Sequence, residues 1–187
     1  MRSRQLDNPF DMEFERTEFS DESYGIVGRA LAYAVKFEAD CRALNLLFNV
    51  KSRLQSRALS LEDEQSFHTF VNEVHKRQLN SHVRQVIEYL ELPTDIGGVL
   101  QVGREKRNEV AHDLCVGIQN DVETDEGRER LLSDVSAAIR AITKAHEIIL
   151  LVTCAVTNAP PPSNDYLRTY ADRVAEWVCS TSHADLK

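Results

Sequence analysis

Five polar side chains suited to binding or cleaving a phosphodiester lie close together: Arg104, Lys106, Arg107, Asn108 and His112. Histidine titrates near neutral pH and can accept or donate a proton. Arginine presents a planar fork of donors that matches two phosphate oxygens. Cleavage of RNA by its own 2′-hydroxyl needs a proton acceptor, a proton donor and a cation beside the phosphorane. These residue types would allow Arg107 to bind a phosphate, Asn108 to orient the substrate or the imidazole, and His112 to be the acid or base. Arg104 and Lys106 are predicted to bind substrate.

Helical spacing would place these side chains on one surface. Positions four apart share a helix face, so Arg104, Asn108 and His112 would form one polar column. Arg107 would lie about 100° round the helix from Asn108, near enough for its long side chain to reach the same concavity. A single helix therefore suffices to present the whole set.

An ordinary solvated helix face is the alternative interpretation of these residues. Two glutamates alternate with the basic residues at spacings that allow ion pairs along the helix. The separation between arginine and histidine also recurs from Arg77 to His82 and from Arg140 to His146. His146 falls on an apolar stripe and is predicted to be a core histidine, whereas Arg77 and His82 follow a bend and are predicted to be solvated. The segment 104–112 differs from these two matches because an amide directly follows its arginine and because it lies late in the predicted bundle.

The run from Arg107 to His112 reads Arg-Asn-Glu-Val-Ala-His and resembles the R-x4–6-H motif of the HEPN superfamily, whose arginine is often followed by a polar residue. These proteins are small helical bundles, and many are metal-independent RNases of toxin–antitoxin, antiviral or RNA-processing systems. The resemblance covers about residues 23–157 and includes a similar first helix, Gly28 to Glu38. One departure is Leu114, where toxin members often have tyrosine. It weakens assignment to the toxins paired with nucleotidyltransferases.

The resemblance implies a metal-independent endoribonuclease of toxin or defence type that acts on RNA as a homodimer. One histidine cannot conveniently do both proton transfers in a turnover, and a two-fold axis would bring a second His112 opposite the first across a cleft. A nucleotidyltransferase-like antitoxin is a possible partner. The rival hypothesis is a non-catalytic helical regulatory or binding protein, because mannitol-repressor proteins carry a similar Arg-Asn-x-x-Ala-His stretch.

Long helices are the elements expected to position this segment. The chain has no glycine or proline between Gly28 and Pro93 or between Gly127 and Pro160, whereas an all-β chain needs turn residues about every ten positions. We predict an all-α fold, an antiparallel bundle of four long helices plus a shorter C-terminal fifth helix. The predicted helices cover 27–48, 61–92 with a bend between Val74 and Leu79, 96–116, 125–159 and 165–179.

Charge and length suggest one domain with an acidic extension. The 187 residues carry a formal net charge of −8. Residues 1–22 hold seven acidic and three basic residues and are predicted to be a polar, flexible arm, followed by a single helical domain at 23–182 and a tail at 183–187. The segment 104–112 has a local excess of positive charge, so the negative total argues against a broadly basic surface but not against an RNA site. We hypothesise that the acidic arm shields this site.

Metals, cofactors and membranes are not expected. The four cysteines, Cys41, Cys115, Cys154 and Cys179, form no CxxC pair, and we interpret them as reduced thiols of a cytoplasmic protein. His68, His75 and His82 repeat every seven residues, but a rise of about 10.5 Å between neighbours is too long for a shared metal. We interpret them as one edge of a helix or a subunit contact. The longest apolar run is too short to span a bilayer, and the N-terminus does not resemble a secretory signal.

Overall fold

The computed structural model describes residues 18–55, 62–114 and 124–180. That part of the chain is all-helical and contains no strand, which confirms the predicted fold class. Its helices are α1 (Glu18–Gln55), α2 (Glu62–Lys76), α3 (Leu79–Tyr89), α4 (Thr94–His112), α6 (Asp125–Thr157) and α7 (Asn164–Cys179).

The predicted second helix is two helices in the structure. Arg77 and Gln78 leave the helical path, and Gln78 is extended before α3 begins. The five-residue step from Val74 to Leu79 turns a helix by about 140°, so the two buried residues cannot share one face of a continuous helix. The break lets Leu79 turn back toward the core. The count of four long helices plus a fifth therefore does not describe the chain, because six helices occur in its described part.

The other helix ends follow the expected capping chemistry. Thr124 accepts a hydrogen bond from the Gly127 amide at 3.1 Å at the start of α6, and Ser163 accepts one from Tyr166 at 3.2 Å at the start of α7. At its end, α4 stops at His112, four residues before the predicted boundary. Residues 18–22, assigned to the acidic arm, are part of α1, and the rest of the arm lies outside the described residues.

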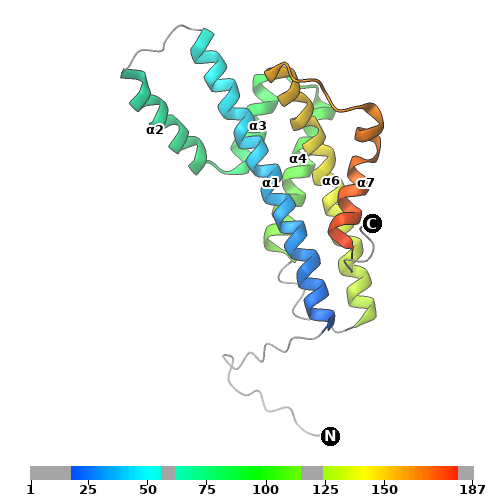
Figure 1. The fold of residues 1–187 in the computed structure, drawn as a ribbon. Coiled ribbons are helices and arrows are strands. Elements are labelled where there is room, and N and C mark those ends of the chain that lie inside the picture. The colour runs from blue at the N-terminus through cyan, green and yellow to red at the C-terminus, as the bar shows by residue number, and fades with distance from the viewer. Residues whose placement is uncertain (1–17, 56–61, 115–123, 181–187) are drawn as a thin grey trace, which may run out of the picture.

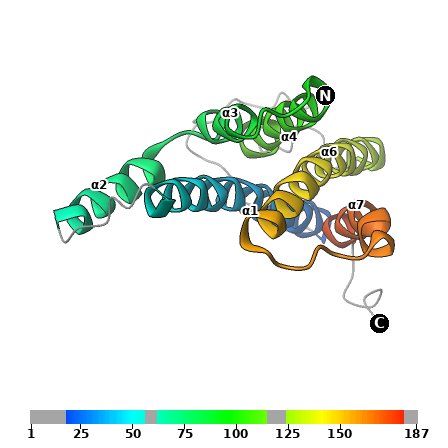
Figure 2. The ribbon, with the colours of Figure 1, turned by 90° about the horizontal axis from the view of Figure 1, so that it is seen from above.

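Successive helices run up and down, and α1 and α6 lie side by side in the same direction (Figures 1 and 2). Two contacts fix this parallel register: Glu22 pairs with Arg128 at 2.6 Å, and Asp40 with His146 at 2.7 Å. α4 and α7 run opposite to α6, and all three helices pack against α1. α2 projects from the far end of α1 and contacts only that helix among the described ones.

The core lies where α4 and α6 pack against α1. Gly103 of α4 allows the closest approach, since a Cβ there would lie 2.3 Å from Cβ of Ala145 in α6. Phe37 of α1 is fully buried and reaches the same place. The Asn45 side-chain amide ties α1 to α3 by donating to the His82 carbonyl oxygen at 3.0 Å. The contact at Gly103 holds the middle of α4, the helix of the predicted site, against α6 and α1.

One side of α1 carries nine uncharged residues that are mostly exposed, with Asp21 and Arg42 on the same side of the helix. Seven of the nine are exposed and the last two are half-buried. Helical spacing brings them onto one face over about 39 Å of the helix. This outward row consists of Tyr24, Gly28, Leu31, Ala32, Val35, Ala39, Ala43, Leu46 and Val50. A solvated helix normally carries polar side chains on such a face.

No helix in the described part of the chain is both long enough and apolar enough to cross a membrane.

Candidate functional site

Arg107 does not point into open solvent but lies between α4 and α1. Its Nη2 forms an ion pair with Oε2 of Glu38 on α1, and the other carboxylate oxygen, Oε1, accepts from Arg42 Nη2 at 3.1 Å. The three side chains are between 16% and 26% exposed. One carboxylate therefore holds two guanidinium groups at the edge of the α1–α4 contact.

Asn108 connects this cluster to the next residue of α4. Its Oδ1 accepts a hydrogen bond from Arg107 Nη1 at 3.2 Å, and its side chain is exposed. This hydrogen bond places the Asn108 amide against the Arg107 guanidinium.

The two predicted substrate-binding residues both have protein partners. Arg104 donates from Nη1 to Asn80 of α3 at 3.2 Å and pairs through Nη2 with Glu105 at 3.0 Å. Lys106 pairs with Glu109 one turn along α4 at 2.5 Å. These ion pairs match the alternative interpretation of a solvated helix face, and exposed pairs of this kind contribute only about 0–1 kcal/mol to stability.

His112 is separate from this cluster. It is exposed at the last position of α4 and makes no hydrogen bond or ion pair with any described residue. Five residues turn a helix by about 140°, so His112 and Arg107 project from well-separated sides of α4. The expected column of positions 104, 108 and 112 exists along the helix, but the structure does not bring Arg107 and His112 together within one chain.

Glu38 and Arg42 are site residues that the sequence did not reveal. They are four residues apart on α1, a spacing that signals an ion pair along a helix. Nothing local indicates that Arg107, 69 residues later, completes the cluster. That contact depends on how α1 and α4 pack.

The prediction that Arg77 and His82 are solvated is wrong for His82. His82 is fully buried on α3, and neither ring nitrogen has a hydrogen-bond partner of good geometry. Burial lowers the pKa of His82, and the nearby Arg42 charge lowers it further, while the Arg77 backbone and Glu38 oppose the shift. His68 and His75 are exposed on α2, whereas His82 is buried on α3, so the three histidines do not form one edge of a single helix.

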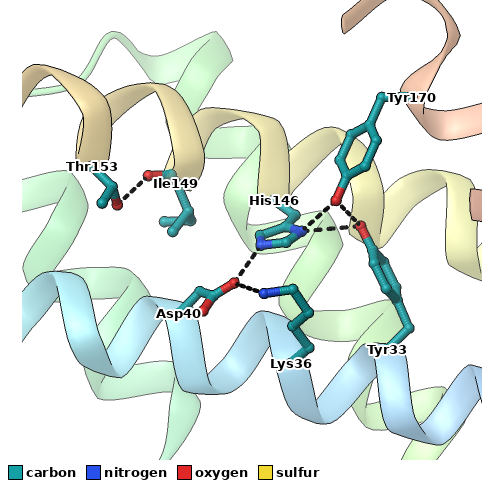
Figure 3. Close-up of polar contacts among 7 residues, drawn as sticks. All are labelled: Tyr33, Lys36, Asp40, His146, Ile149, Thr153 and Tyr170. Atoms are coloured by element: carbon teal, nitrogen blue, oxygen red, sulfur yellow. Dashed lines mark hydrogen bonds and ion pairs between the residues drawn. The ribbon is translucent and has the colours of Figure 1, made fainter. Parts of the chain in front are cut away.

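His146 is the core histidine that its apolar stripe predicted. It is fully buried, and both of its ring nitrogens have partners on neighbouring helices (Figure 3). Nε2 is 2.7 Å from Asp40 Oδ2, while Nδ1 is 3.0 Å from the Tyr33 hydroxyl and 3.3 Å from the Tyr170 hydroxyl. In the tautomer that fits these contacts, Nε2 donates to the carboxylate and Nδ1 accepts from a tyrosine hydroxyl. The Tyr33 and Tyr170 hydroxyls are also 3.4 Å apart, so one of them can donate to Nδ1 and the other to its neighbour.

The ionisation of this network favours a neutral histidine. Burial lowers the pKa of His146, and the hydrogen bond and charge of Asp40 only partly oppose the shift. Partial burial would raise the pKa of Asp40, but contacts with Lys36, at 2.7 Å, and with His146 hold it below its ordinary value. Burial also raises the pKa of Tyr33 far above its ordinary range. The cluster therefore joins α1, α6 and α7 through neutral hydrogen bonds around one carboxylate.

No group of three or more potential metal ligands occurs among the described residues. Cys41, Cys154 and Cys179 are free thiols, and burial raises the pKa of Cys41 and of Cys179. Cys115 lies outside the described residues.

Searches against family models, curated proteins and solved structures found no significant match to this chain.

Proposed function

We propose that this protein is a HEPN-like endoribonuclease that cuts RNA as a homodimer without a bound metal. The observation that carries the proposal is the pair of guanidinium groups at the α1–α4 contact. One of them belongs to Arg107, which lies close in the chain to His112, and the His112 side chain is exposed and has no partner among the described residues. Arg107 binds the scissile phosphate, Asn108 holds its guanidinium, and His112 transfers the proton. A soluble, cytoplasmic toxin or defence protein is the corresponding cellular role, with a nucleotidyltransferase-like antitoxin as its candidate partner.

A second copy of the chain supplies what one copy lacks. Since Arg107 and His112 project from different sides of α4, a phosphate held by Arg107 needs its proton donor or acceptor from elsewhere. A second protomer brings another His112 to a shared cleft, which also provides separate groups for the acid and base steps.

The outward row of α1 supports this homodimer because its middle part is complementary to itself in size. If two copies of the row pack antiparallel about a two-fold axis between Ala32 and Val35, Tyr24 lies against Ala43 and Gly28 against Ala39. At these two pairs, and where Ala32 meets Val35, at least one of the facing residues is small, which allows close helix packing. Outside this middle part of the row, Leu31 faces Lys36 and Leu46 faces Asp21. Glu38 lies near the middle of the row, so this interface would flank the arginine cluster.

Cleavage of RNA in the presence of excess chelator tests the proposal. We expect the wild-type protein to cleave single-stranded RNA, and we expect His112→Ala and Arg107→Ala to lose at least about a hundredfold in rate, the usual contribution of acid–base catalysis. Arg84→Ala is the matched control, since Arg84 is an exposed arginine paired with Glu88 on α3. Intact RNA with the folded wild-type protein under every condition would refute the enzyme.

A non-catalytic regulatory or binding protein, of mannitol-repressor-like or antitoxin-partner type, is the second candidate. The ion pair between Arg107 and Glu38 favours it, because a structural role already occupies the arginine. In that case the chain would bind its partner or nucleic acid without cleavage, and the rate measurements above would separate the two candidates.

A further inference from the structure

The Arg42–Glu38–Arg107 cluster has unused hydrogen-bonding capacity. Glu38 occupies Nη2 of each arginine, whereas Nε of Arg42 and Nε of Arg107 are buried and have no hydrogen-bond partner among the described residues. Buried donors without an acceptor are uncommon in folded proteins and cost free energy. Two such donors beside one carboxylate indicate a missing acceptor.

A further polar side chain lies next to the cluster. The ring of His82 is fully buried and lacks a hydrogen-bond partner of good geometry, and the charges of Arg42 and Glu38 both act on it. Arg104, which α4 carries one turn before Arg107, likewise has a buried Nε without a partner. Unpartnered arginine Nε atoms from α1 and α4 thus occur in the cluster and one turn from it, and His82 of α3 lies beside the cluster.

An oxyanion fits the charge of the cluster. Two guanidinium groups and one carboxylate leave a net charge of +1, which matches the single negative charge of a phosphodiester. The side chains of Arg42 and Arg107 are 26% and 18% exposed while each Nε is buried, so an oxyanion reaches Nε only when these side chains shift. Guanidinium groups donate to phosphate oxygens, and each Nε is a donor that Glu38 leaves unused.

We propose that Arg42 and Arg107 together bind one phosphodiester group at the junction of α1, α3 and α4, with Glu38 as the positioning residue that holds the two guanidinium groups side by side. This inference rests on the proposed function for the identity of the RNA, but it adds Arg42 of α1 to the site and assigns both arginines to the same phosphate. Binding, not cleavage, is its primary consequence.

Equilibrium binding of a short single-stranded RNA with 2′-O-methyl groups tests it, because this probe cannot be cleaved through its 2′-oxygen. We expect Arg42→Gln and Arg107→Gln each to weaken binding about tenfold, in the range of one charge-assisted hydrogen bond. Since both residues hold one phosphate, the double variant should lose much less than the product of the two single effects. Arg84→Gln, which removes an exposed arginine of α3, should bind like wild type.

Three controls keep the outcome interpretable. Circular dichroism verifies that each variant is folded, and Arg42→Lys, which keeps the charge but loses the fork, should recover only part of the affinity. Inorganic phosphate and the same RNA are compared as competitors, and stronger competition by phosphate assigns the site to free oxyanions instead of RNA. Wild-type affinity in Arg42→Gln, or single effects that multiply fully in the double variant, would overturn the shared site. Loss of binding in a protein that never cleaves RNA would support this site and refute only the nuclease.

Discussion

His146 shows how burial sets the chemistry of a single side chain. Its ring is enclosed by Tyr33 and Asp40 of α1 and Tyr170 of α7, with the ammonium group of Lys36 beside the carboxylate. The neutral tautomer fits these contacts, and a proton on Nδ1 would break the hydrogen bond from a tyrosine hydroxyl. Protonation of His146 therefore opposes folding, even though the charge of the adjacent Asp40 carboxylate favours the protonated ring.

Stability should fall as the pH falls below about 6.5, the ordinary pKa of histidine. The pKa of His146 is lower in the folded protein, so below pH 6.5 the unfolded chain binds a proton that the folded chain does not, and the free energy of unfolding decreases. The lowered pKa of Asp40 acts only at more acidic pH, near and below 3.8. Urea titrations across this range should show a shallower pH dependence in His146→Gln than in wild type.

Two other histidines matter for the interpretation of that measurement. His82 is also buried with a lowered pKa, so a residual slope should persist in His146→Gln. His75 is exposed on α2, and His75→Gln is the matched histidine-to-glutamine control. A His146→Gln profile with the full wild-type slope would show that this ring does not titrate with folding.

At the scale of the helix, two glycines of α4 have opposite surroundings. Glycine is a poor helix former, so the glycines in the first half of α4 should weaken it. Gly98 faces open space, since a Cβ at this position would have no atom within 4 Å, whereas Gly103 packs directly on Ala145 of α6. The same residue type is therefore a weakness at one position and a packing requirement at the other.

Substitution by alanine should separate these two roles. We expect Gly98→Ala to stabilise the protein by roughly 0.5–1 kcal/mol through helix propensity. Gly103→Ala should destabilise it by about 1–3 kcal/mol, because α4 must move away from α6 to admit the methyl group. Chemical unfolding of both variants measures the difference. Equal effects at the two positions would contradict the close α4–α6 contact.

At the scale of the whole molecule, α1 is the central element and has two different faces. One face packs against α3, α4, α6 and α7, and the other is the outward row. Exposed apolar surface of this extent is characteristic of interaction sites. The nine residues of the row are uncharged, with Asp21 and Arg42 beside them, and the small residues near its middle allow the close approach of a second copy.

A charge placed on the row should dissociate the homodimer. Val35 of the row is 52% exposed, so Val35→Glu costs a single chain little but buries a carboxylate at the α1–α1 contact of a dimer. We expect light scattering to give the mass of a dimer for wild type and of a monomer for Val35→Glu. The matched control is Val102→Glu on α4, where the valine is 47% exposed and outside the row. A monomeric wild type, or a dimer that survives Val35→Glu and not Val102→Glu, would exclude this interface.

The features that could be predicted from the sequence are those that depend on residues close together in the chain. Apolar spacing and the scarcity of glycine and proline identified the helical class, and Thr124 was recognisable as the position before α6. The burial of His146 followed from its place on the stripe between Ile142 and Ile149. The break between α2 and α3 was recognisable only as a bend, because no glycine or proline marks Arg77 and Gln78.

Only part of the candidate site could be predicted from the sequence. Its residues on α4 could be chosen from type and spacing, but the partner of Arg107 is Glu38, 69 residues earlier, and the burial of His82 depends on α1 and α3 packing together. The sequence alone thus determined the helices, since periodicity is a local property of the chain. Only the tertiary structure decided which charges meet, because side chains from distant segments become neighbours through the packing of whole helices.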